Sequence, residues 1–103
     1  MDPRQLPSPG TEAALRRSIA EAAAGNPDYD QMGPGFAAAV REQLPRVQQI
    51  FKEFGAVEAL KFTGVDPQGS DQYHVRFEHG VADFVIRVGP DGKIVTAAFQ
   101  PSP

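Results

Sequence analysis

The residues best able to do chemistry in this sequence stand close together, between Tyr73 and Asp83. His74 is the candidate for a general base, a role that needs a neighbouring carboxylate and a pocket. Asp83 supplies the carboxylate, because the strand pairing that we predict puts His74, Arg76 and Asp83 on one polar face of a sheet. Charged side chains on a strand are most simply a solvated surface, and we therefore predict no catalytic residue.

Tyr73 is the second candidate, since a tyrosine hydroxyl in a cavity can stabilise developing charge when an acid lies beside it. Tyr73 and Asp83 are expected on opposite faces of the sheet, so this pair does not form. A core tyrosine with a hydrogen-bonded hydroxyl is the favoured interpretation. Four aromatic residues are the candidates for contact with a small apolar ligand between helices and sheet: Tyr29, Tyr73, Phe51 and Phe84.

The sequence predicts neither a metal site nor a cofactor. It has no cysteine, and His74 and His79 are five positions apart on a strand and its turn, which does not suit chelation of one ion. Asp28 and Asp30 are too few oxygen ligands for a calcium loop and are interpreted as turn residues. The Gly-Pro-Gly segment at 33–35 lacks the lysine and the spacing of a phosphate-binding loop.

The composition is that of an ordinary globular domain. The chain has 103 residues, 41% hydrophobic and 22% charged, which is enough for one two-layer core. A net charge of -3 argues against a nucleic-acid partner, because phosphate binding needs a basic surface. No apolar run approaches membrane-spanning length, and no membrane partner is expected. Since the start lacks a secretory signal, the chain as given is expected in the cytoplasm, or in the periplasm if excised from a larger exported protein.

We expect a flexible Pro-rich arm at 1–10, a single domain at 11–100 and a tail at 101–103. The domain opens with a helix at 12–24, for which Thr11 is the predicted N-cap. The apolar stripe of this helix has the spacing of an amphipathic helix and consists of Leu15, Ile19 and Ala22.

A second helix is expected at 36–54, where apolar residues recur every three or four positions: Phe36, Val40, Leu44, Val47, Phe51 and Phe54. Pro45 lies inside this span, off the stripe, and should clash with the carbonyl of Arg41. The uninterrupted stripe favours one helix kinked at Pro45. Two abutting helices, broken near Gln43 or Leu44, are the alternative.

From Ala56 onward the apolar residues alternate, which predicts β-strands. The first two strands are expected at 56–65 and 71–78, joined by a type I turn at 66–69 with Asp, Pro and Gly at favoured positions. The last strand is expected at 93–100. Two helices on one face of a curved four-stranded antiparallel meander make a two-layer α+β domain.

A two-residue hairpin turn at His79-Gly80 sets the predicted pairing of the central strands. Its inner pairs are Tyr73 with Ile86, Val75 with Phe84, and Phe77 with Ala82. On the outer surface Arg76 faces Asp83 as an ion pair, and His74 meets Val85. A slip by one residue would mix apolar and polar side chains on each face.

The final strand follows a turn at 89–92, and both of its faces are apolar. Loop length decides which set points inward: Ile94, Thr96 and Ala98 after a three-residue loop, or Val95, Ala97 and Phe99 after a four-residue loop. In either case the outer face, which also carries Val85, is not cleanly polar. This predicts a homodimer or a partner protein bound through the sheet.

Four segments carry a resemblance to known families: Phe54-Gly55, 60–62, 73–80 and 89–94. The layout resembles the NTF2-like and cystatin-like families, in which helices pack into a curved antiparallel sheet. The second half is similar to the small C-terminal domain of some bacterial serine hydrolases of the beta-lactamase-like type, with Tyr opening a strand and Asp-Gly-Lys-Ile opening the last one. The resemblance implies an accessory or ligand-binding domain rather than a catalyst, and the hydrolase's Ser-x-x-Lys motif is absent from this chain.

We therefore predict a non-catalytic binding or dimerisation module. One alternative is a small NTF2-like hydrolase or isomerase that uses Tyr73 or His74, and another is an accessory domain of a larger exported serine hydrolase. An enclosed cavity with convergent polar groups would favour the enzyme. A filled core beneath an apolar outer sheet face would favour the binding module.

Overall fold

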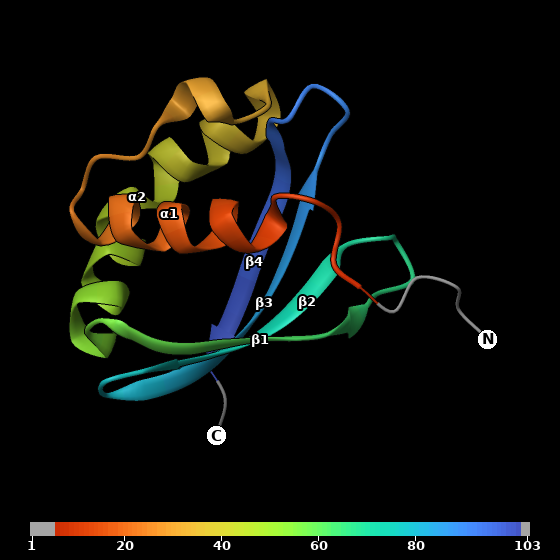
Figure 1. Ribbon diagram of the computed structural model, residues 1–103. Coiled ribbons are helices and arrows are strands. Elements are labelled where there is room, and N and C mark those ends of the chain that lie inside the picture. Colours follow the sequence, from red (N-terminus) through yellow and green to blue (C-terminus); the bar gives the residue numbers. More distant parts are fainter. Residues whose placement is uncertain (1–5, 102–103) are drawn as a thin grey trace.

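The fold is described by a computed structural model for residues 6–101. Residues 1–5 of the predicted arm at 1–10 and residues 102–103 of the predicted tail at 101–103 lie outside the described residues. Its elements in chain order are α1 (Thr11–Ala23), a short 3-10 helix η1 (Tyr29–Gln31), α2 (Pro34–Phe54), β1 (Val57–Val65), β2 (Asp71–Phe77), β3 (Gly80–Val88) and β4 (Ile94–Pro101). The strands form one antiparallel sheet in the order β1-β2-β3-β4, and both helices lie on the same face of it (Figure 1). The predicted α+β class is confirmed. Within the described residues, neither helix is long and apolar enough to cross a membrane.

The first helix buries the predicted stripe but begins differently. Its N-cap is Gly10, with φ 85°, and Thr11 is the first helical residue rather than the cap. The prediction of Thr11 as N-cap is wrong because its hydroxyl points to the sheet and bonds to Asp71 instead of to the helix's own amides. The apolar face of α1 is buried and consists of Ala14, Leu15, Ile19 and Ala22.

The second helix is continuous through Pro45, so the alternative of two abutting helices is wrong. Pro45 is exposed, and its ring nitrogen has no hydrogen to donate to the carbonyl of Arg41. Of the predicted stripe only Phe51 is fully buried, while the rest are half-buried: Phe36, Val40, Leu44, Val47 and Phe54. The predicted stripe of α2 therefore packs against the sheet mainly in the C-terminal half of the helix.

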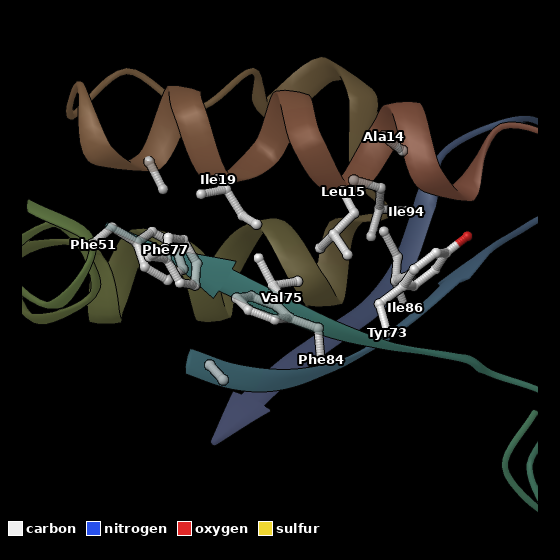
Figure 2. Close-up of a cluster of buried hydrophobic side chains, with 12 residues drawn as sticks. Ala14, Leu15, Ile19, Phe51, Tyr73, Val75, Phe77, Phe84, Ile86 and Ile94 are labelled. Atoms are coloured by element: carbon white, nitrogen blue, oxygen red, sulfur yellow. The ribbon is translucent and has the colours of Figure 1, made fainter. Parts of the chain in front are cut away.

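The core lies between α1, the end of α2 and the inner face of the sheet (Figure 2). Phe51 is its centre, with ring centroids 5.0 Å from Phe99, 6.1 Å from Phe84 and 6.3 Å from Phe77. Alternate residues of β2 and β3 face inward and are buried: Tyr73, Val75, Phe77, Ala82, Phe84 and Ile86. Burial of each large apolar side chain stabilises the fold by about 1.5–3 kcal/mol.

The pairing of β2 with β3 differs from the prediction by two residues. Tyr73 pairs with Phe84 rather than Ile86, and the two turn residues are Glu78 and His79 rather than His79 and Gly80. The inner pairs observed are Tyr73 with Phe84, Val75 with Ala82, and Phe77 with Gly80. A shift of two residues preserves the faces, so inward and outward positions are as predicted.

The end of α2 explains this turn. The His79 amide donates to the Phe54 carbonyl, and the Glu78 amide donates to the Ala56 carbonyl. Gly80 has no positive φ; instead, a Cβ on it would stand 2.7 Å from the ring of Phe54. Gly80 is thus required for space beneath an aromatic ring and not for a turn conformation.

The predicted cross-strand ion pair between Arg76 and Asp83 is also wrong, for the same reason. Arg76 stands opposite Val81, and its Nε lies 3.6 Å from a carboxylate oxygen of Glu58 on β1. Asp83 stands opposite His74. Arg76 and Asp83 still lie on the outer face, as predicted.

The residues of β4 that face the core come partly from one predicted alternative and partly from the other. Ile94 is buried, and the strand then has an irregularity opposite Arg87 and Val88, after which Ala97 and Phe99 pack against the core. One residue is thereby skipped in the alternation. Hydrogen bonds close both predicted turns, from Gly69 N to Asp66 O and from Gly92 N to Gly89 O.

Candidate functional site

The outer face of the sheet is the candidate functional surface, because the helices cover only the other face (Figure 1). We use "outer face" for the side chains that point away from the helices: Gln72, His74 and Arg76 from β2; Val81, Asp83, Val85 and Arg87 from β3; Thr96, Ala98 and Gln100 from β4. These side chains are half-buried or exposed. The fold therefore presents a wide surface that strand alternation alone creates.

The predicted polar set His74, Arg76 and Asp83 does share this face. His74 Nδ1 and Asp83 Oδ1 lie 2.8 Å apart, with side chains 44% and 57% exposed. The bond leaves Nε2 as the nitrogen of His74 not used by this carboxylate. Such a dyad has the atoms of a general base but stands in water, where an ion pair contributes little and no substrate is enclosed.

A shallow hollow of about 410 Å³ lies beside this dyad. On its outer-face side it is lined by Thr63, Gln72, Asp83, Val85, Ala98 and Gln100. Apart from Asp83 these side chains are neutral, and the hollow is open to solvent. It can receive a protruding side chain, but Asp83 has no second titratable side chain beside it in the outer-face lining.

Tyr73 belongs to a closed polar cluster on the inner side of the sheet. Its hydroxyl lies 2.7 Å from the hydroxyl of Thr11, which lies 2.8 Å from Oδ2 of Asp71. The amide of Ser8 donates to the same oxygen at 2.8 Å. Since Thr11 donates its one hydroxyl proton to Asp71 at 2.8 Å or to the Ser8 carbonyl at 3.1 Å, Tyr73 is the donor in its contact with Thr11.

The burial and the hydrogen bonds of this cluster are those of a structural contact between a helix and the sheet. Thr11, Asp71 and Tyr73 are each 1% exposed, and together they join the start of α1 to β2. Neither the buried Asp71 nor the sheet contact of Thr11 was predicted from the sequence, although both positions follow the predicted periods. Asp71 is two residues before the inward Tyr73, and Thr11 is four residues before the buried Leu15.

The structure brings three of the four predicted ligand-contact residues into the core and leaves the fourth outside it. Phe51 and Phe84 are neighbours, and Tyr73 belongs to the same buried cluster. Tyr29 lies in η1, half-buried, with the guanidinium carbon of Arg41 4.3 Å from its ring centroid. Around Phe51 the aromatic rings pack against one another, and Phe51 also lines an open hollow on the helical side.

The turn residues considered for metal or phosphate binding have local roles. Asp28 caps η1, its Oδ1 accepting from the Asp30 amide. Gly33 precedes α2, and its amide donates to the carbonyl of Ile94. In the part of the chain that the structure describes, no group of three or more potential ligands could hold a metal ion.

A second hollow, about 460 Å³ and also open, lies on the helical side. Its walls come from α1, the end of α2 and the start of β1, with apolar residues at the base and Arg16 and Lys52 beside them. Arg16 is already paired with Glu12, at 3.3 Å. Two helix C-termini, which carry partial negative charge, approach this hollow beside the cations of Arg16 and Lys52, so the two electrostatic contributions oppose each other.

No family model, curated protein or solved structure matches this chain.

Proposed function

We propose that this chain is a non-catalytic module that associates with a second copy of itself through the outer face of its sheet. The observation that carries the proposal is the row formed by Gln72, Val85 and Ala98, which are cross-strand partners at the middle of this face. All three are uncharged, and the hollow lies over them. Protein interfaces typically combine a neutral centre with a charged rim.

The charged side chains of the outer face stand around this row. Along the direction of the strands, the ion pair of Arg76 with Glu58 lies on one side of this row, and Arg87 lies on the other side. Asp83 separates the row from Val81. A partner that covers the row would bury neutral side chains and leave most charges near water, which limits the cost of desolvation.

The dispositions of Tyr73 and His74 support a binding module over a small NTF2-like hydrolase or isomerase. The hydroxyl of Tyr73 is engaged by Thr11 inside the closed cluster, and a catalytic hydroxyl must face its substrate. His74 is exposed and does not line the adjacent hollow. An accessory domain of a larger exported serine hydrolase would use the same surface and is compatible with this proposal.

The test is the oligomeric state of the chain in solution. Light scattering coupled to size exclusion should give the mass of a dimer at high protein concentration. Ala98→Arg places a long cation at the exposed β4 end of this row and should shift the chain to monomer. The matched control is Ala38→Arg, on an exposed position of α2, which should leave the dimer intact.

Circular dichroism should show that both variants keep the fold of the unmodified chain. A chain that is monomeric at every concentration overturns the proposal. So does a dimer that tolerates Ala98→Arg while Ala38→Arg disrupts it.

A further inference from the structure

Three outer-face residues of β3 place an acidic and a basic side chain at equal distances on either side of a valine. Asp83, Val85 and Arg87 follow one another at intervals of two, so their side chains point the same way. Val85 stands midway between an acid and a base. Both charged side chains are exposed, and within residues 6–101 Arg87 takes part in no ion pair.

This order of charges restricts how two copies can meet face to face. In a symmetric dimer of two sheets packed with their strands aligned, the two-fold axis lies between the sheets and runs either along the strands or across them. An axis along β3 stacks Asp83 on Asp83 and Arg87 on Arg87, which places like charges together. An axis across the strands at Val85 reverses the strand direction in the second copy, and Asp83 then meets Arg87 of that copy twice.

The neighbouring strands fit the second arrangement as well. With the axis along the central row, Gln72 meets Gln72, and an amide carries both the donor and the acceptor that such a pair needs. On β4 Ala98 meets Ala98, which allows close approach. Thr96 and Gln100, the partners of Arg87 and Asp83, exchange places and meet each other as neutral polar groups.

We propose that two copies pack sheet to sheet about a two-fold axis that crosses β3 at Val85, with Asp83 of each copy paired to Arg87 of the other. This inference rests on the proposed function and adds its geometry. The two charged pairs set the orientation, while the neutral row between them provides the contact. Complementary charges act mainly on specificity and register, and like charges in contact are costly.

Charge reversal in the full chain tests the pairing. Asp83→Arg and Arg87→Asp each put two like-charge contacts into the dimer and should raise its dissociation constant at least about tenfold. The double variant restores opposite charges and should return to within about threefold of the unmodified chain. Residues 83 and 87 are about 13 Å apart on one strand, so a rescue reports contact between copies and not within one.

The controls match each change in net charge on the other side of the molecule. Glu42→Arg and Arg46→Asp change exposed residues of α2 and should leave the dissociation constant unchanged. Sedimentation equilibrium gives the constants, and circular dichroism confirms folding of every variant.

The outcomes separate this inference from the proposed function. Single variants that dimerise like the unmodified chain overturn the pairing, as does a double variant as weak as the singles. If Ala98→Arg still gives a monomer in those cases, the outer face remains the interface with another axis. If Ala98→Arg also leaves the dimer unchanged, the outer face is not the interface at all.

Discussion

The hydroxyl oxygens of Tyr73 and Thr11 lie 2.7 Å apart, although 62 positions separate the two residues in the chain. Thr11 also bonds to Asp71, so one buried hydroxyl joins the first turn of α1 to the first residues of β2. Buried polar groups that have partners cost little, while those that lose a partner are expensive. The link therefore holds the helical layer in place over the sheet.

Tyr73→Phe should lower the free energy of unfolding by about 1–2 kcal/mol, because Thr11 loses a buried donor. From sequence alone this change is expected to leave folding largely intact, and the buried cluster revises that expectation. Urea denaturation followed by circular dichroism measures the difference. The control is Tyr29→Phe, which keeps its ring beneath Arg41 and should stay within about 0.5 kcal/mol of the unmodified chain. Equal stability of the two variants would contradict this account.

Thr11→Val should cost more, about 2–3 kcal/mol, because it removes a partner from both Tyr73 and Asp71 while keeping the side-chain volume. Thr11→Ser keeps the hydroxyl and loses one methyl group, so its effect should be smaller than that of Thr11→Val. The same denaturation experiment compares the two. A larger loss for the serine variant would show that packing, and not the hydroxyl, is the main contribution of Thr11.

His74→Ala should change the free energy of unfolding by less than about 1 kcal/mol, because its bond to Asp83 is exposed. A double-mutant cycle with Asp83→Ala isolates the energy of the pair, and all four proteins are compared at one concentration so that association does not differ between them. The exposure of both side chains indicates that water reaches the dyad. A coupling energy above about 2 kcal/mol would contradict this.

Pro45→Ala should stabilise the chain by about 1–2 kcal/mol, because alanine supplies the missing amide for the Arg41 carbonyl within a continuous helix. The unfolded chain also gains freedom, and this offsets part of the benefit. Thermal unfolding gives the sign directly. Gln43→Ala, on an exposed position nearby, is the control and should change stability by only a few tenths of a kcal/mol. A destabilised Pro45→Ala would indicate that the proline shapes α2 to fit the sheet.

Gly55→Ala should destabilise the chain by about 1–3 kcal/mol, because Gly55 has φ 82° and ψ -158°, a region open mainly to glycine. Its added Cβ would also lie 2.7 Å from a carboxylate oxygen of Glu78, which accepts the Ala56 amide. Gly92→Ala is the control, since Gly92 has the same φ with nothing within 4 Å. The Gly92 variant should be the less destabilised of the two in urea denaturation, and the reverse order would contradict the steric argument.

Strand alternation predicted the faces of β2 and β3 but not their pairing. Tyr73, Val75 and Phe77 face the core in both the predicted and the observed register. The two registers differ by two residues, and such a shift leaves each side chain on the same face of its strand. The observed register depends on Gly80, which leaves room for the ring of Phe54 at the end of α2. A contact between a helix and a turn 26 positions apart is not visible in the pattern of either one.

The interior polar contacts were only partly predictable. The pattern placed Tyr73 in the core, and Asp71 and Thr11 share the periods of the buried stripes. Carboxylate and hydroxyl side chains at such positions are ordinarily assigned to the surface, because burial is costly without partners. Their partners come from another layer of the fold.

Local sequence patterns were enough to predict the two amphipathic helices, the alternating strands, the turns at 66–69 and 89–92, and the side chains of β2 and β3 that face the core. Each of these depends on residues within one element, where backbone geometry sets the period. Packing between segments set four further features: the register at Gly80, the change of face in β4, the cluster around Asp71 and the partner of His74. Those features depend on distances between segments remote in the chain, and several arrangements satisfy the same local pattern until packing selects one.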